Sequence, residues 1–413
     1  MNGLVLAYDV LAKIYKEDAF SSIELNKRVV GANNQAVVTR LVYGVLQKDI
    51  ELDYYISALT TKKPSKTILV LLKLGLYCLK YMDSFPDYAV VDEVVDLCEK
   101  LGKRQLKGFV NSTLKTFISK GKTIDLPKDN IGKLSVKYSI PLWLSKAYIK
   151  QYGLEKTEEF LSVEEFTKEH IRNNPFVWTL DELKKDLDKQ GIEYIQSIAD
   201  GLFVDNSAYI KKLNNDGKIT YQSMTSMLAV KALDMKDNEI LLDMCSAPGG
   251  KAVYASQLAD IKVVACDIHE HRLQLINSYA NRIGVKSITT MLNDGCGYNK
   301  DFDKKFDKVL CDVPCSGLGV AGKKPDIYLR SSMEKVEEIS KIQYQILTNA
   351  SKYTKDNGRI VYSTCTTLRE ENYNIVGRFV KENKDWQILD CKNYLPDGKG
   401  TDGFFIAVLE KKN

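Results

Sequence analysis

One stretch, Glu239 to Ala252, constrains the fold of this chain more than any other. It reads E-I-L-L-D-M-C-S-A-P-G-G-K-A. The apolar run Ile240 to Leu242 predicts a buried strand that ends at Asp243, and helical spacing resumes at Lys251 after a loop of small residues. A strand, a glycine-bearing turn and a helix N-terminus form a nucleotide-type cradle, because glycines let the backbone approach a ligand and free N–H groups face it.

The residue pattern of this cradle excludes the common phosphate-binding motifs. Cys245 stands where a P-loop needs its first glycine, and Ala252 stands where it needs Ser or Thr. A second predicted strand ends in Asp267, and an acidic residue at about this spacing binds ribose hydroxyls. A ligand with a ribose but no phosphate, S-adenosylmethionine, fits this pattern. The alternative is an ordinary strand-to-helix turn in any α/β fold.

Length and composition set the outer bounds. At about 100–200 residues per domain, 413 residues predict two or three domains. Nine scattered cysteines and a start interrupted by Asp9 and Lys13 favour a reducing cytoplasm without a signal peptide. The longest apolar run, Ile68 to Leu79, contains Lys73 and falls short of the ~20 residues of a membrane span, so we expect a core helix and no membrane partner.

Three segments differ in pattern. Residues 1–125 have only helical periodicity and hold 18 Lys and Arg against 14 Asp and Glu. A predicted linker, Gly121 to Gly132, leads into residues 126–225, which continue as a small α+β segment. A helix of this segment starts at a predicted capping box, Thr179 and Glu182. Residues 226–413 alternate strand and helix, as a doubly wound sheet does. The basic cluster in the first segment is a candidate RNA-binding stripe, although on charge alone a solvated lysine face is favoured; it comprises Lys103, Arg104, Lys107, Lys115, Lys120 and Lys122.

Polar residues follow the predicted strands of the third segment, where ligands bind in such sheets. The strands are predicted at 240–243, 262–266, 287–291, 306–312, 358–364 and 403–409. The residues after them include Cys245 to Lys251, Asp267, Asp294, Asp312 to Gly317, and Ser363 to Thr366. Two cysteines, Cys315 and Cys365, and three carboxylates therefore converge on one edge.

Cysteines at this edge indicate a particular methyl acceptor. Oxygen and nitrogen acceptors need no thiol, but C5 of cytosine is a poor nucleophile until a thiolate adds to C6. A base must then remove the C5 proton, and a carboxyl group such as Asp312 can stabilise charge at N3. Position does not separate the roles of Cys315 and Cys365. A zinc site would require Cys311 and nearby histidines, but no C-x-x-C pair is present, so we expect no metal.

The motifs resemble those of bacterial ribosomal RNA (cytosine-C5) methyltransferases of the RsmB (Sun/Fmu) type, over nearly the whole chain. The resemblance rests on L-D-M-C-S-A-P-G-G-K, D-V-P-C-S-G-L-G, S-T-C-T and the terminal G-T-D-G-F-F-I-A. It implies a NusB-like all-α bundle at 1–125, a connector and small α+β RNA-binding segment at 126–225, and a Rossmann-like class I methyltransferase at 226–413. It also implies a monomer that acts on 16S ribosomal RNA.

The resemblance assigns roles residue by residue. Asp267 would hold the ribose of S-adenosylmethionine and Asp294 the adenine side, while Asp312 would lie near both donor and base. Cys365 would be the nucleophile, and Cys315 would assist product release. The cradle residues would bind the donor, with Lys251 also orienting Asp312 or a loop carbonyl: Cys245, Ser246, Ala247, Pro248, Gly249, Gly250 and Lys251.

Two segments depart from the family pattern, and neither includes Cys315 or Cys365. Gln222-Ser223-Met224-Thr225-Ser226 lacks the acidic residue of the family's Q-D-E-S-S stretch, and Ala321-Gly322-Lys323-Lys324 lacks one cation. Two other functions stay open: methylation of a transfer RNA cytosine, and a non-catalytic RNA-binding protein that keeps the cofactor fold. The intact cysteines and Gly249-Gly250 argue against the second.

Overall fold

The computed structural model describes residues 2–29, 31, 34–164 and 166–412. The chain forms two compact units, Met1–Ser162 with Ala321–Arg330, and Val163–Val320 with Ser331–Asn413. The division of the sequence at 126 and 226 stays a prediction.

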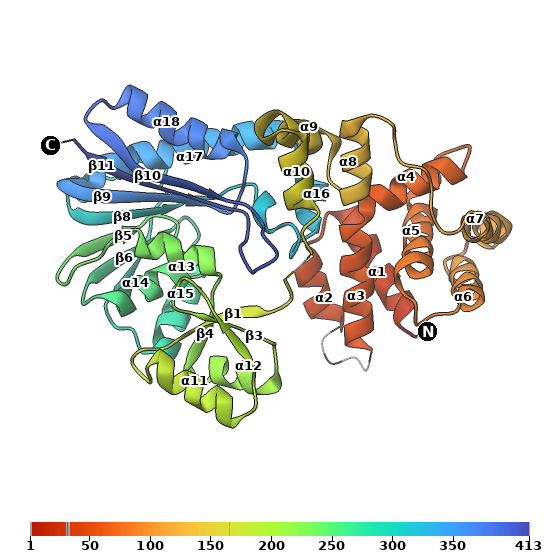
Figure 1. Ribbon diagram of the computed structural model, residues 1–413, viewed down its shortest axis with the longest axis horizontal. Coiled ribbons are helices and arrows are strands. Elements are labelled where there is room, and N and C mark those ends of the chain that lie inside the picture. Colours follow the sequence, from red (N-terminus) through yellow and green to blue (C-terminus); the bar gives the residue numbers. More distant parts are fainter. Residues whose placement is uncertain (1, 30, 32–33, 165, 413) are drawn as a thin grey trace. The chain divides into compact units, whose positions relative to one another are not determined.

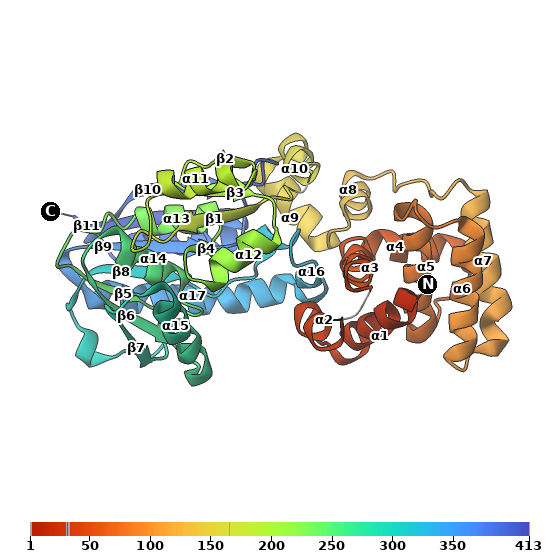
Figure 2. The ribbon, with the colours of Figure 1, turned by 90° about the horizontal axis from the view of Figure 1, so that it is seen from below.

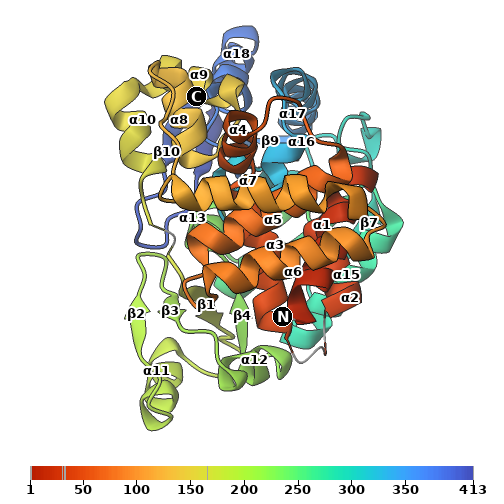
Figure 3. The same cartoon turned by 90° about the vertical axis from the view of Figure 1, so that its right-hand side faces the viewer.

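The first unit is helical, as predicted, and centres on α5 (Lys66–Tyr81), which packs against α1, α3, α4, α6 and α7 (Figure 3). Ile68 and the whole run Val70 to Leu79 are buried, which confirms the predicted core helix. The buried Lys73 forms an ion pair with Asp53 at 2.9 Å and another with Asp49. In the described ranges no helix is long and apolar enough to cross a membrane. The other helices of this part are α1 (Asn2–Glu17), α2 (Ser21–Val29), α3 (Gln35–Gln47), α4 (Asp49–Leu59), α6 (Asp87–Lys100), α7 (Lys107–Ser119), α8 (Asn130–Tyr138), α9 (Leu142–Tyr152) and α10 (Leu154–Leu161).

A segment distant in sequence completes this unit. Residues 321–330, with α16 (Asp326–Arg330), pack on the helices although they come directly after the loop of Cys315. The Arg330 guanidinium donates to the carbonyls of Asp18 at 2.9 Å and Ala19 at 2.5 Å, and lies 3.8 Å from the ring centroid of Phe20. Residues 321–330 are thereby held within the helical unit.

The second unit contains a four-stranded antiparallel sheet in the order β2-β3-β1-β4, with α11 contacting β1 and α12 contacting β4 (Figure 2). The predicted capping box at Thr179 and Glu182 is present and starts α11. The elements are β1 (Glu169–Asn173), α11 (Leu180–Lys189), β2 (Tyr194–Gln196), β3 (Leu202–Val204), α12 (Ala208–Asn215) and β4 (Ile219–Tyr221).

The main sheet has seven strands in the order β10-β11-β9-β8-β5-β6-β7, and only β10 and β11 pair antiparallel to their neighbours. Helices α17 and α18 cover one face, and α13, α14 and α15 cover the other (Figure 1). Both faces are thus buried, as a doubly wound sheet requires. The strands are β5 (Ile240–Asp243), β6 (Lys262–Asp267), β7 (Ile288–Leu292), β8 (Phe306–Asp312), β9 (Thr354–Thr364), β10 (Trp386–Tyr394) and β11 (Phe404–Lys411). The helices are α13 (Met224–Lys231), α14 (Gly250–Leu258), α15 (Glu270–Ile283), α17 (Met333–Tyr353) and α18 (Tyr373–Glu382).

The edge strand β10 is absent from the six strands predicted by sequence. Its register shifts between Ile388 and Asp390, and Leu389 is half exposed. A bulge interrupts the alternation of apolar and polar residues on which strand prediction depends, and a sheet edge buries less apolar surface. Helix α8 was not predicted from sequence, and it begins at Asn130, inside the predicted linker Gly121 to Gly132.

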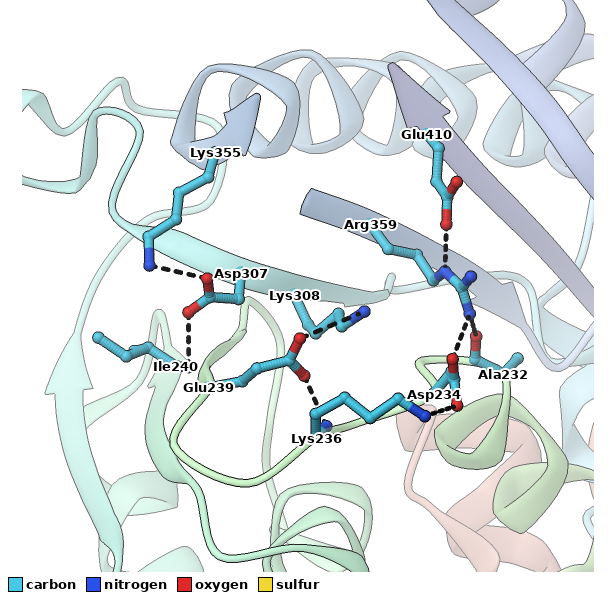
Figure 4. Close-up of polar contacts among 10 residues, drawn as sticks. All are labelled: Ala232, Asp234, Lys236, Glu239, Ile240, Asp307, Lys308, Lys355, Arg359 and Glu410. Carbon is cyan, nitrogen blue, oxygen red and sulfur yellow. Dashed lines mark hydrogen bonds and ion pairs between the residues drawn. The ribbon is translucent and has the colours of Figure 1, made fainter. Parts of the chain in front are cut away.

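A polar network closes the amino-terminal ends of the central strands, away from the cradle (Figure 4). Asp307 on β8 accepts from Lys355 Nζ at 2.7 Å and from the Ile240 amide at 2.9 Å. Arg359 on β9 donates to Glu410 on β11 at 2.6 Å and to the Ala232 carbonyl at 3.1 Å. These contacts join β5, β8, β9 and β11 at the end of the sheet that carries no candidate site residue.

Candidate active site

The predicted cradle lies between β5 and α14. Gly249 has φ 100° directly before the helix, and a Cβ there would lie 3.1 Å from Ile276 on α15. Glycine is therefore required both by the backbone and by the packing of α15. The Gly249 amide donates to the Ser246 carbonyl at 2.7 Å, and the Ser246 amide donates to the Cys266 carbonyl on β6 at 2.8 Å. These bonds fix the loop, so the first amides of α14 face the carboxyl edge of the sheet.

The next strand ends place carboxylates around this loop. Asp267 at the end of β6 is 4% exposed, and its carboxylate accepts from the His269 amide at 3.0 Å and pairs with Arg272 at 3.4 Å. Sequence reasoning missed the arginine contact, because it depends on where α15 begins. Asp294, in the turn after β7, is exposed and accepts from the Cys296 amide at 2.9 Å.

A polar cluster joins the cradle to β8 and β9. Lys251 Nζ lies 2.6 Å from Asp312 Oδ2, and the Ser363 hydroxyl donates to Asp312 Oδ1 at 2.7 Å. The expected contact between Lys251 and Asp312 is thus present. Asp243, at the end of β5, is 1% exposed; burial, followed by the charge of Asp312, raises its pKa to about 7.

The two cysteines meet at the end of neighbouring strands. β8 and β9 run parallel with Asp312 opposite Ser363, so the residues that follow them turn out side by side. Cys315 Sγ lies 3.1 Å from Cys365 Sγ. The register of two strands, rather than any local motif, creates this contact.

The environment distinguishes the two thiols. A hydrogen bond from the Cys315 thiol lowers the pKa of Cys365, and the charge of Lys251 acts in the same direction. The same hydrogen bond, followed by burial, raises the pKa of Cys315 well above its ordinary value. The two thiols, which the sequence pattern alone did not distinguish, therefore differ in the direction of their pKa shifts.

Two residues missed by the sequence analysis hold these turns. Glu371 accepts from the Ser316 amide at 2.8 Å, next to Cys315. Asn372 donates to the Thr366 carbonyl at 2.9 Å, next to Cys365. The dipeptide follows the motif S-T-C-T by only a few residues, but nothing in its spacing indicates that it turns back onto both loops.

Across the described part of the chain, no group of three or more His, Cys, Asp or Glu side chains is placed to hold a metal ion. Cys78, Cys98 and Cys311 are buried in apolar cores. His170 is buried in the small sheet, with hydrogen bonds to the Gln222 carbonyl at 2.6 Å and the Ser197 hydroxyl at 2.7 Å, so it has a structural role there.

This seven-stranded sheet, with its cradle after β5 and its polar edge, has the Rossmann-like fold of the class I methyltransferases. Residues 230–410 match the family described as 16S rRNA methyltransferase RsmB/F, and residues 2–119 match the NusB family. The chain belongs to the RsmB/F family of ribosomal RNA small subunit methyltransferases.

Individual relatives cover nearly the whole chain. The probable ribosomal RNA small subunit methyltransferase B of Bacillus subtilis is 31% identical, over 98% of each chain. The ribosomal RNA small subunit methyltransferase B of Shigella boydii is 30% identical, over 93% of this chain and 92% of its own. The crystal structure of PH0851 shares the fold, with a TM-score of 0.81 and 23% identity over 99% of this chain and 98% of that one.

Proposed function

We propose that the protein methylates C5 of one cytosine in 16S ribosomal RNA, with S-adenosylmethionine as methyl donor and a covalent bond between Cys365 and C6 of the base. The observation that carries this proposal is the 3.1 Å contact between Cys315 and Cys365 at the carboxyl edge of the sheet, and the lowered pKa of Cys365 supports it. Methyl transfer to oxygen or nitrogen has no use for two thiols at the acceptor side.

The residues of the cradle fit the donor. The first amides of α14 can donate to a ligand at the carboxyl edge of the sheet, and the Asp267 carboxylate suits ribose hydroxyls. Asp294 would lie on the adenine side. When bound, the donor supplies an electrophilic methyl group.

The reaction divides between the two cysteines. The Cys365 thiolate adds to C6, and C5 then attacks the methyl group. Asp312, oriented by Lys251 and Ser363, would face N3 of the base and, once protonated, donate a hydrogen bond to N3 as negative charge develops there. A base removes the C5 proton with the assistance of Cys315, and Cys365 leaves as a thiolate when C5 and C6 regain their double bond.

Outside this site, we assign RNA affinity to the helical unit and to the segment 126–225, which contains the small four-stranded sheet. It has the protein act as a monomer in the cytoplasm, without a metal. Curated relatives that cover nearly the whole chain carry the name ribosomal RNA small subunit methyltransferase, which favours ribosomal over transfer RNA.

The test is to compare Cys365→Ala with Cys315→Ala on unmodified 16S and transfer RNA. Cys365→Ala should neither methylate nor crosslink. Cys315→Ala should transfer the methyl group and stall, giving a protein–RNA adduct that survives boiling in detergent and needs the methyl donor.

The opposite pattern of adducts would exchange the two roles. Full activity in both variants would end the covalent mechanism. Adducts with transfer RNA alone would mean that the substrate is transfer RNA and not 16S ribosomal RNA. RNA binding without methylation by the unaltered protein would favour a non-catalytic function.

A further inference from the structure

Two consecutive buried residues connect the loops that carry the candidate cysteines. Glu371 is the last residue of the short 3-10 helix η4 (Arg369–Glu371), and Asn372 directly precedes α18. Glu371 is 0% exposed and Asn372 is 1% exposed. Their side chains come from one turn, yet each reaches a different cysteine loop.

Glu371 holds the loop of Cys315. Its carboxylate accepts from the Ser316 amide at 2.8 Å and from the Ser316 hydroxyl at 2.5 Å. Gln343 on α17 donates to the same carboxylate at 3.0 Å and to the Pro314 carbonyl at 2.9 Å. The residues on both sides of Cys315 are thereby fixed.

Asn372 holds the loop of Cys365 in the same way. Its side-chain oxygen accepts from the Thr364 hydroxyl at 2.6 Å, and its side-chain nitrogen donates to the Thr366 carbonyl at 2.9 Å. Thr364 and Thr366 flank Cys365, so this thiol too is held from both sides.

Glu371 is an ionisable residue in a fully buried position, so its hydrogen-bond partners need an explanation. A buried carboxylate is costly unless it is paired or well hydrogen-bonded. Among the described residues, no ion pair includes Glu371, and its carboxylate forms hydrogen bonds with Ser316, Gln343 and Thr366. The Tyr362 hydroxyl donates to the Glu371 carbonyl at 2.6 Å, which also ties the backbone of this turn to β9.

We propose that Glu371 and Asn372 are positioning residues that fix the spacing of Cys315 and Cys365, so that the thiol that assists removal of the C5 proton stays beside the thiol bonded to C6. This inference rests on the proposed function, because it assigns the two thiols to successive steps of one reaction. Without the clamp, attack and methyl transfer proceed, but proton removal is delayed.

The spacing can be measured without RNA or methyl donor, by oxidation with diamide. The two thiols form one S–S bond. The N=N group of diamide takes up their two electrons and two protons and becomes a hydrazine. Peptide mapping would follow the Cys315–Cys365 linkage in Glu371→Gln, in Asn372→Asp and in a matched control, Asn374→Asp, at an exposed position of α18. We expect oxidation about tenfold slower in the first two variants, as the loss of one or two hydrogen bonds implies, and unchanged in the control.

Steady-state methylation, together with a gel assay for the protein–RNA adduct, is the second measurement. Glu371→Gln and Asn372→Asp should lower kcat, leave KM for RNA unchanged and accumulate the same adduct as Cys315→Ala. Unchanged oxidation rates in both variants would overturn the clamp. So would a loss of donor binding by calorimetry in both, because the pair would then support the fold and not the spacing. Slower oxidation, with no adduct in Cys315→Ala, would keep the clamp and reject the covalent mechanism.

Discussion

At the residue scale, Asp267 is the carboxylate on which the proposed donor site depends most. A hydrogen bond to a charged group contributes about 1.5–3 kcal/mol, so Asp267→Ala should weaken donor binding by about one to two decades for each hydrogen bond removed. Calorimetry would measure this, with Asp260→Ala as control, because Asp260 is exposed and lies at the other end of β6. Equal donor affinity in the two variants would remove Asp267 from the site.

Asp243 gives stability a pH dependence. Burial, followed by the charge of Asp312, raises its pKa from 3.8 to about 7. The folded chain holds the proton of the Asp243 carboxyl group more tightly than the unfolded chain does. This protonation therefore stabilises the fold fully below pH 3.8, and the stabilisation is lost as the pH rises through about 7.

Asp243→Asn removes the titrating group. Its unfolding free energy should fall less with rising pH, by up to about 1.4 kcal/mol per pH unit, in the window between the two pKa values. Urea unfolding at a series of pH values would compare the two proteins. Parallel curves would show that Asp243 keeps its ordinary pKa in the folded chain.

At the element scale, the polar network in Figure 4 should affect the stability of the fold but not the chemistry of the candidate site. Arg359 links β9 to β11 and to the end of α13, and its side chain is 20% exposed. We expect Arg359→Ala to lower the free energy of unfolding by about 1–3 kcal/mol, without changing donor affinity.

The matched control for that change is Arg378→Ala. Arg378 pairs with Glu382 within α18, and its side chain is 58% exposed, so its loss should cost about 0–1 kcal/mol. Denaturant unfolding would rank the two variants. Equal losses would mean that the network at the amino-terminal edge adds nothing beyond a surface ion pair.

At the scale of the whole molecule, the proposed function places the chemistry in the second unit and part of the RNA affinity in the helical unit. Lys115 and Lys120 are exposed on and just after α7, in the basic stripe predicted from sequence. Replacing both by glutamine should make the slope of log K for RNA binding against log salt concentration less steep, by about 0.7–0.9 for each phosphate that the variant no longer neutralises. Donor affinity should stay unchanged.

Lys262→Gln with Lys381→Gln removes the same charge from exposed positions of the second unit and is the control. Binding titrations over a series of salt concentrations would give both slopes. Equal slopes would favour the solvated lysine face over an RNA-binding stripe.

Features that depend on spacing along the chain could be predicted from the amino-acid sequence. They include the cradle after Asp243, the helical nature of the first segment, the capping box at Thr179, and the convergence of Cys315 and Cys365 on one sheet edge. These signals are local, because helical and strand periodicities and turn residues act over a few positions.

Which of these groups touch one another depends on how distant segments pair in the folded chain. The register of β8 against β9 sets the thiol contact, the return of the chain after β9 brings Glu371 and Asn372 onto both loops, and residues 321–330 join the helical unit. The bulged strand β10 likewise forms because β11 is there to pair with it. Pairing between distant segments leaves little trace in any short window of sequence, because its free energy comes from the partner.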